Sequence, residues 1–304
     1  MVSKTVLRWL TLATLVGLSL GVMVPVALAT DITACPFTIS SPGTFVVTKN
    51  LTATGASCIK VHSDNVAIDL KGHTIKGDKT EGNDGITDNC FGESGVAISH
   101  GKIMDFDDGI DFCSGRDISI DQVDSSDNAG DGIDIDGSDN TFTFVKADRN
   151  GGLGIDNDSS GDLFSNVEAS NNKDSGIIVD DENGFTKVTA SHNGDNGLDL
   201  TGTDNIITYT TANDNGEDGM FFDDFDNRVA NSVANDNKTD GIDMPFGGDN
   251  EVIKSTTNHN GTDGVFIKCT GIGGTSNVVR LSAHGNGTNL SETGTCTNLL
   301  NKAP

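Results

Sequence analysis

The chain repeats a short apolar pattern along most of its length. From Gly109 onward, each repeat glycine is followed directly by an apolar residue and by a second one two positions later, where Asn157 is the exception. A period of two places both apolar columns on one face of a short β-strand, which must be the interior. The glycine recurs every 21 to 24 residues, at Gly85, Gly109, Gly132, Gly154, Gly176, Gly197, Gly219, Gly241 and Gly264.

The length of the repeat decides the architecture. About 22 residues can hold three short strands and their turns, whereas a strand with a full crossover helix needs a longer unit. Stacked repeats of this size bury a continuous core between neighbours. The sequence therefore predicts an all-β fold, a single-stranded parallel β-helix (solenoid) of roughly 9–11 coils with about 22 residues per coil.

Asparagine forms two further columns in phase with the glycines. One stands four residues before most glycines, at Asn128, Asn150, Asn172, Asn193, Asn215, Asn237 and Asn260. The other follows eight or nine residues after the glycine, at Asn140, Asn205, Asn227 and Asn250, with Asn183 one position earlier. Three columns in phase favour a stacked structure over chance.

The first asparagine column has a physical explanation. Asparagine tolerates the left-handed backbone of a sharp turn, and its amide both donates and accepts hydrogen bonds. We expect these asparagines to adopt that backbone conformation. Their side chains should form a continuous ladder from coil to coil, as stacked amides do elsewhere. The alternative is glycan contact, or glycosylation at Asn237 and Asn260.

Residues 1–29 have the features of a secretory signal peptide. Lys4 and Arg8 supply the positive start, an apolar run covers residues 9–24, and Ala27-Leu28-Ala29 fits a small-x-small cleavage site. We expect residues 30–62 to cap the first coil, 63–284 to form the β-helix and 285–304 to close the other end. The predicted location is secreted, extracellular or periplasmic, with no membrane span left after cleavage.

The charge of the exported chain limits the classes of partner that it can bind. The chain holds 19 basic and 45 acidic residues, and loss of Lys4 and Arg8 leaves 17 basic ones, a net charge of −28. Nucleic acid, anionic membranes and free polyuronates are excluded, because they need a counter-charge that this protein lacks. Divalent cations and neutral extracellular glycans are compatible with it.

Six cysteines follow the cleavage site, and an even number in an exported protein favours disulfides. Cys90 stands five residues after its repeat glycine and Cys113 four, so the two should stack in adjacent coils within bonding reach. We expect Cys35 to pair with Cys58 at the N-terminal end. The last pair is then Cys269 with Cys296.

Two segments carry a resemblance to a known superfamily. Residues 65–75 (NVAIDLKGHTI) and 95–103 (GVAISHGKI), which lead into Asp108-Gly109-Ile110, resemble the opening coils of pectin-lyase-like proteins. With the repeats, this resemblance covers residues 60 to 285. It implies a right-handed parallel β-helix. It implies no particular chemistry, because the superfamily contains lyases, hydrolases, epimerases, adhesins and non-enzymatic proteins.

The catalytic motifs of that superfamily do not recur in this chain. A Ser99-His100-Gly101 segment precedes the paired carboxylates instead of following them, as it would in polygalacturonases, and no Arg-Ile-Lys occurs. The basic residue that pectate lyases need beside an acidic motif is missing, and so is the Asp-Pro-His of mannuronan epimerases. We therefore expect a binding protein without turnover; an enzyme with this sequence would degrade polysaccharide.

One outward column of the predicted strands carries candidate chemistry. Neighbouring coils lie about 4.8 Å apart, so Asp111, Asp134 and Asp156 should form a carboxylate row in which mutual repulsion raises at least one pKa. Ca²⁺ is the expected ion to bridge such a row. The complete column reads Asp111, Asp134, Asp156, Ile178, Asp199, Phe221, Asp243 and Phe266.

The second half of this column supports an alternative. Asp199 and Asp243 are two coils apart, about 9.6 Å by the same rise, near the upper limit for the acid and base of an inverting glycosidase. Phe221 and Phe266 could support a sugar ring. The preferred prediction is an acidic strand face that binds divalent cations or glycans without catalysis. The alternatives are a glycoside hydrolase, or less readily a lyase or epimerase, and a structural or adhesive surface protein.

Overall fold

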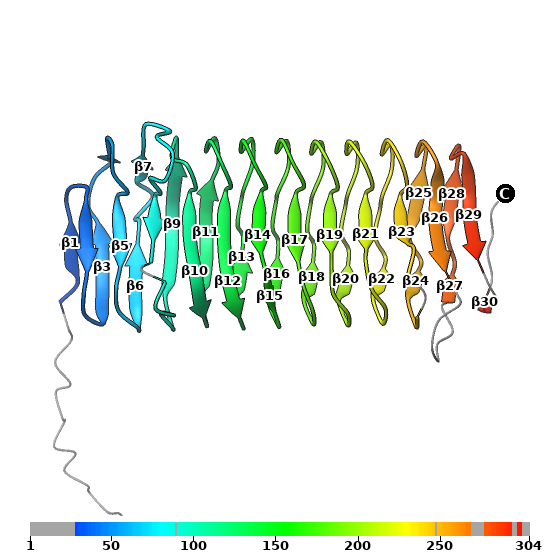
Figure 1. The fold of residues 1–304 in the computed structure, drawn as a ribbon, viewed down its shortest axis with the longest axis horizontal. Helices are drawn as coiled ribbons and strands as arrows, with labels where there is room; N and C mark the ends of the chain where they lie inside the picture. Colours follow the sequence, from blue (N-terminus) through cyan, green and yellow to red (C-terminus); the bar gives the residue numbers. More distant parts are fainter. Residues whose placement is uncertain (1–27, 89, 247, 269–276, 294–296, 300–304) are drawn as a thin grey trace, which may run out of the picture.

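The computed structural model describes residues 28–88, 90–246, 248–268, 277–293 and 297–299. These residues form a parallel β-solenoid of about 11 coils with about 22 residues per turn. The coils follow one another along the long axis of the molecule, from the N-terminal strands to the C-terminal ones (Figure 1). The predicted fold class and repeat are confirmed. The expected signal peptide and the cysteine pair Cys269–Cys296 lie outside the described residues, apart from Leu28 and Ala29.

Each coil adds one strand to each of two long parallel sheets. The first sheet contains β1 (Thr30–Ile32), β3 (Gly43–Val47), β4 (Leu51–Thr52), β6 (Val66–Asp69), β7 (Thr74–Lys76), β9 (Ala97–Met104), β11 (Ser119–Ser125), β13 (Thr141–Thr143), β16 (Leu163–Ser165), β18 (Gly184–Thr186), β20 (Ile206–Thr208), β22 (Arg228–Ala230), β24 (Glu251–Ile253), β27 (Asn277–Val279) and β30 (Thr297–Leu299). These strands start as early as Thr30, inside the segment predicted to form the N-terminal cap.

The second sheet holds the strands that begin at the repeat glycines. It contains β2 (Phe37–Ile39), β5 (Ile59–Val61), β8 (Ile86–Thr87), β10 (Ile110–Arg116), β12 (Ile133–Ser138), β14 (Ile155–Asn157), β15 (Ser159–Ser160), β17 (Ile177–Val179), β19 (Leu198–Leu200), β21 (Met220–Phe222), β23 (Ile242–Met244), β26 (Asp263–Lys268) and β29 (Thr288–Thr293). A third face is formed by β25 (Thr256–Asn258), β28 (Ser282–His284) and single bridges from Asp124 to Thr256.

The interior is formed by the two predicted apolar columns. Ile110, Ile133 and Ile155 stack in register in the second sheet and are fully buried. Phe142, Phe164 and Phe185 enter the same core from the first sheet, and consecutive rings are parallel with centroids 4.6 Å apart. Contacts between equivalent residues of neighbouring coils thus account for most of the packing.

Asn157, which interrupts one apolar column, is buried and has its own partner. Its Nδ2 donates to the Asp162 carboxylate at 2.6 Å, and the Asp162 carboxylate also accepts from Ser159. Asp162 fills the gap in the second asparagine column, since its Oδ1 accepts the backbone N–H of Asn140 and its own N–H donates to Asn183. The exception in the pattern is therefore part of a polar network in the core.

The first asparagine column forms the predicted ladder. The Oδ1 of Asn172 accepts from both the backbone N–H and the Nδ2 of Asn150, at 2.9 and 3.2 Å. The Nδ2 of Asn172 also donates to the backbone oxygen of Ala147, one coil back. Asn286 extends this ladder by one coil, although no repeat glycine marks that coil, and its Nδ2 donates to Asn289 of the same coil. Glycosylation of the ladder residues Asn237 and Asn260 has no support here, because both amides are buried in these bonds.

The expected left-handed backbone of the ladder residues was wrong. The positive φ angle belongs to the preceding residue, such as Arg149 (56°), His192 (61°) or Asp214 (57°). The preceding side chain can point into solvent while its backbone makes the turn. The ladder asparagine then keeps an ordinary backbone and directs its amide along the stack.

Two of the three predicted disulfides are described and confirmed. Cys35 bonds to Cys58, with Cα atoms 4.6 Å apart, and Cys90 bonds to Cys113, with Cα atoms 5.2 Å apart. Both join successive coils and link residues 23 positions apart in the sequence. Among the described residues, no helical segment has the length and apolar character needed to cross a bilayer.

Candidate functional site

The outer column of the second sheet is arranged as the sequence predicted. Asp111 of β10 pairs in register with Asp134 of β12, and Asp134 with Asp156 of β14. The column then continues through Ile178, Asp199, Phe221, Asp243 and Phe266. All of these side chains are half-buried instead of fully exposed. The expected carboxylate row therefore exists, but it lies in a less polar environment than an open strand face provides.

The strand alternation did not reveal a second acidic column near the first. A second acidic column stands directly before the repeat glycines, beside the outer column, and we call it the pre-glycine column. Its members are Asp84, Asp108, Asp131, Asp218, Asp240 and Asp263, with Leu153, Ser175 and Asn196 between them. The sequence contains the signal for this column, because its residues recur with the same period as the glycines.

The pre-glycine column is also a ladder. Oδ1 of Asp108 accepts the backbone N–H of Asp131 at 2.6 Å, and Oδ1 of Asp240 accepts that of Asp263 at 2.6 Å. One oxygen of each of these carboxylates therefore has a structural role. The second oxygen is left for other interactions on the acidic face, as we call the outer and pre-glycine columns together.

Two compact groups of carboxylates include residues of this face. In each group, one ligand oxygen per residue lies within 4.8 Å of the others. The first group is Asp84, Asp107 and Asp108, and the second is Asp218, Asp240 and Asp243. The predicted metal residues Asp111, Asp134 and Asp156 are neighbours in one row, but within the described part of the chain they do not form such a group.

The electrostatics of the row agree with the predicted direction. Burial, followed by the charges of Asp156 and Asp111, raises the pKa of Asp134 to about 8. Burial is also the first cause for Asp111 and Asp156, whose pKa values rise to about 6. Repulsion within the row thus contributes, but desolvation of the carboxylates contributes more.

Asp243 combines three unusual properties. Burial, then the carboxylates of Asp218, Asp240 and Asp263, raises its pKa to about 8. Its Oδ1 is buried and has no hydrogen-bond partner. A carboxylate oxygen in that position needs a proton or a cation to offset its desolvation.

Asp199, the predicted partner of Asp243 in catalysis, lies two coils away, with Phe221 of β21 between them. It accepts a hydrogen bond from Nδ2 of Asn196 at 3.1 Å. Burial raises the pKa of Asp199, and the bond from Asn196 offsets only part of that rise. The aromatic rings of Phe221 and Phe266 lie in the same column and are half-buried.

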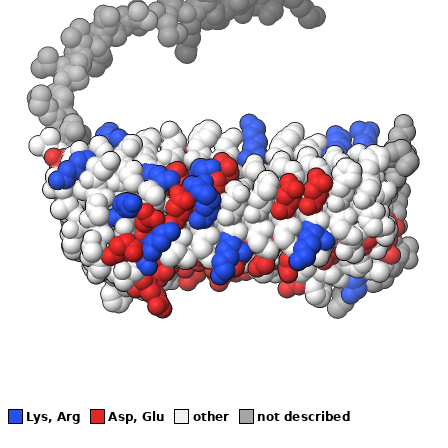
Figure 2. Space-filling view, turned by 90° about the horizontal axis from the view of Figure 1, so that it is seen from above, with Lys and Arg blue, Asp and Glu red and all other residues white. Residues whose placement is uncertain are grey.

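Basic side chains are concentrated on other faces. Lys102 pairs with Asp124 at 3.2 Å and Lys146 with Glu168 at 3.0 Å, in each case between successive coils of the third face. Figure 2, a view from above, shows such basic side chains interleaved with acidic ones along one side of the molecule. Among the residues that the structure describes, no carboxylate of the acidic face forms an ion pair. Lys60 partly offsets the rise in the pKa of Asp84 without forming an ion pair with it, so the charge of this face is mostly unbalanced.

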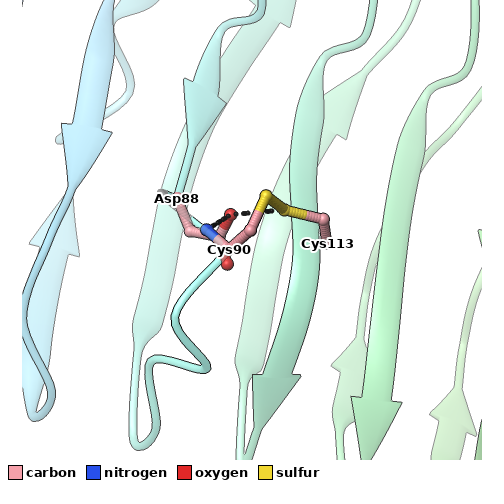
Figure 3. Close-up of side chains that lie close together, drawn as sticks. All are labelled: Asp88, Cys90 and Cys113. Atoms are coloured by element: carbon pink, nitrogen blue, oxygen red, sulfur yellow. Dashed lines mark hydrogen bonds between the residues drawn. A yellow bond between two sulfur atoms is a disulfide. The ribbon is translucent and has the colours of Figure 1, made fainter.

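A third group of potential ligands lies beside the disulfide. Asp88 Oδ1 accepts the backbone N–H of Cys90 at 3.0 Å and lies 3.2 Å from Sγ of Cys113 (Figure 3). The two sulfur atoms are bonded to each other, so they offer no thiolate to a metal. This group holds the loop that follows β8 in place.

Comparisons with known proteins agree with this architecture. Residues 154–302 match the family model described as right handed beta helix region. No curated protein matches the sequence. The A-module of the Azotobacter vinelandii mannuronan C-5 epimerase AlgE4 superposes with a TM-score of 0.61 at 14% identity, over 84% of this chain and 91% of that module.

Two further solved structures show the same fold. The Dettilon tailspike protein has a TM-score of 0.61 at 14% identity, over 82% of this chain and 61% of the tailspike. The pectate lyase Pel9A has a TM-score of 0.53 at 19% identity, over 85% of this chain and 69% of the lyase. The neighbours thus include polysaccharide-active enzymes and a tailspike. The chain is a right-handed parallel β-helix repeat protein with the pectin-lyase-like fold.

Proposed function

We propose that this protein is exported and that its acidic face binds divalent cations, with Ca²⁺ as the expected ion. The observation that carries the proposal is the group Asp218, Asp240 and Asp243, whose ligand oxygens lie within 4.8 Å of one another. Ca²⁺ prefers several oxygen ligands of this kind and is abundant outside cells. The two disulfides support an oxidising location.

The arrangement of this group supports cation binding over a purely solvated surface. The unpartnered Oδ1 of Asp243 is buried beside two carboxylates that the backbone holds in place through the pre-glycine ladder. Fixed ligands lose little entropy when an ion binds. The group Asp84, Asp107 and Asp108, of which Asp84 and Asp108 stand in the pre-glycine column, provides a second set.

Calcium is expected to raise the melting temperature of the protein, because an ion that binds only the folded state stabilises it. At about one hundred times the dissociation constant, the gain is about 2.7 kcal/mol. Protons compete for the same oxygens, so the gain should be larger at about pH 9 than at about pH 6. Differential scanning fluorimetry with calcium or with chelator measures it.

The Asp243→Asn variant tests the assignment to the second group. It should lose a large part of the calcium-induced shift, whereas Asp127→Asn, in an ion pair with Arg149 on another face, should keep it. A wild-type midpoint that calcium leaves unchanged at both pH values would show that the acidic face is only a solvated surface.

Hydrolysis of a neutral polysaccharide is a second candidate, favoured by one observation. Burial raises the pKa of both carboxyl groups, that of Asp243 to about 8, whereas the bond from Asn196 opposes the rise at Asp199. Unequal environments of this kind can separate the roles of acid and base. Release of reducing sugar from a neutral β-glucan, lost in both Asp199→Asn and Asp243→Asn, would support this activity; no release from wild type would reject it.

A further inference from the structure

Seven asparagines of the chain are followed directly by a glycine, and such pairs can react without an enzyme. Asparagine is a chemically labile residue, because the backbone nitrogen of the next residue can attack its side-chain Cγ atom. Glycine has no side chain to hinder that attack. The pairs begin at Asn150, Asn183, Asn193, Asn196, Asn215, Asn260 and Asn286. Their surroundings in the fold differ, and this difference decides which of them can react.

Six of the seven pairs are protected by the stacking of the coils. The backbone N–H of Gly261 donates to the backbone oxygen of Asn237, one coil away, at 3.0 Å. Bonds of 2.9 to 3.0 Å to a backbone oxygen of a neighbouring coil are also formed by the N–H groups of Gly151, Gly184, Gly194, Gly197 and Gly216. The six asparagines of these pairs are buried. Each glycine nitrogen must therefore lose its bond, and its coil must open locally, before it can attack.

Asn286 and Gly287 form the exception. Asn286 is half-buried and Gly287 is exposed. Within the described part of the chain, the backbone N–H of Gly287 donates no hydrogen bond. The pair lies just before β29, the last strand of the second sheet, so no further strand of that sheet covers its coil (Figure 1). A coil at the end of a stack opens at a lower free energy than one in the middle.

We propose that Asn286 is a modification site, at which the folded protein converts asparagine to aspartate and isoaspartate. The nitrogen of Gly287 bonds to Cγ of Asn286, the Cγ–Nδ2 bond breaks, and the side-chain nitrogen leaves as ammonia with the proton of the glycine N–H. Water then opens the cyclic imide at either of its two carbonyl carbons. The site lies outside the acidic face, so this proposal is independent of the proposed cation binding.

The conversion removes a hydrogen-bond donor that holds the last coil. Nδ2 of Asn286 donates to the backbone oxygen of Thr257 at 2.8 Å and to Oδ1 of Asn289 at 3.1 Å. A carboxylate in its place has no proton to donate and faces two acceptors. Isoaspartate also lengthens the backbone directly before β29. The reaction therefore loosens the last coil, whereas the ladder up to Asn260 keeps its bonds to the preceding coils.

Peptide mapping by mass spectrometry tests the proposal on the full mature chain, kept folded at mildly alkaline pH and body temperature. Asn260 is the matched internal control, because Asn260 and Asn286 are both ladder residues followed by Gly-Thr. Asn286 should convert at least tenfold faster, which corresponds to about 1.4 kcal/mol in the free energy of local opening. In denaturant, the two rates should agree within about twofold, because the shared local sequence alone then acts.

The Asn286→Asp variant tests the effect on the last coil. Hydrogen exchange followed by mass spectrometry should show faster exchange in β28 and β29 than in the wild type, and unchanged exchange in β19. Asn231→Asp, an exposed asparagine of another coil, should exchange like the wild type throughout. The proposal is overturned if Asn286 and Asn260 convert at equal rates in the folded protein, if only the denatured chain converts, or if Asn286→Asp leaves β28 and β29 unchanged.

Discussion

Asn215→Leu is expected to lower the free energy of unfolding by about 4 kcal/mol. Oδ1 of Asn215 accepts two bonds from Asn193, and its Nδ2 donates to Ala190 and Asn237. Leucine makes none of these bonds and leaves several buried polar groups unsatisfied. In a chain of this size, the melting temperature should fall by about 10 °C, as measured by circular dichroism.

Asp195→Leu is the matched control for this variant. Asp195 lies one coil before Asn215 and its side chain is exposed, so the substitution removes no buried bond. Its melting temperature should change by less than about 2 °C. Equal losses in the two variants would mean that the asparagine ladder adds no more stability than an exposed position does.

The double variant Asp134→Asn/Asp243→Asn is expected to be more stable than the wild type at high pH. Both pKa values are raised from 3.8 to about 8, first by burial and then by neighbouring carboxylates. The native state therefore binds protons more tightly than the unfolded state, and wild-type stability is lost as the pH rises from about 4 to 8. Asparagine has no charge to desolvate.

The expected gain at about pH 9 in chelator is about 2 kcal/mol for each residue, after allowance for their partial exposure. Below about pH 4 the wild-type carboxyls are protonated in both states, so the variant and the wild type should melt together. Asp127→Asn should have the opposite effect on stability at high pH. The Arg149 side chain lowers the pKa of Asp127, and removal of that charge slightly destabilises the protein at high pH. A gain that is the same at pH 4 and pH 9 would contradict this account.

Much of the fold could be predicted because the repeat is regular where its packing is regular. Ile133 and Ile135 are buried, and the equivalent positions of the other coils also point inward. Each repeat glycine stands where two successive coils approach each other closely. A Cβ on Gly176, for example, would lie 2.5 Å from the backbone oxygen of Gly197. Such constraints recur with the period, so they are visible in the sequence alone.

The candidate sites were less predictable, because they depend on neighbours outside the strand pattern. Asp243 belongs to a compact group through Asp218 and Asp240, which stand in a different column from the one that the strand alternation drew attention to. The register shift between Phe112 and Gly115 likewise departs from the repeat. Periodicity in the sequence reveals the features that all coils share, but not the contacts that occur in a single coil.

The ladder of asparagines also sets the unit by which this protein can change length. From Asn128 to Asn286, each interface between coils carries the same bonds, such as those from Asn172 to Asn193 and from Asn193 to Asn215. Insertion of one whole coil of about 22 residues would reproduce both broken interfaces, whereas a partial insertion would shift every later column. The molecule can therefore be lengthened or shortened only by whole coils, in steps of about 4.8 Å.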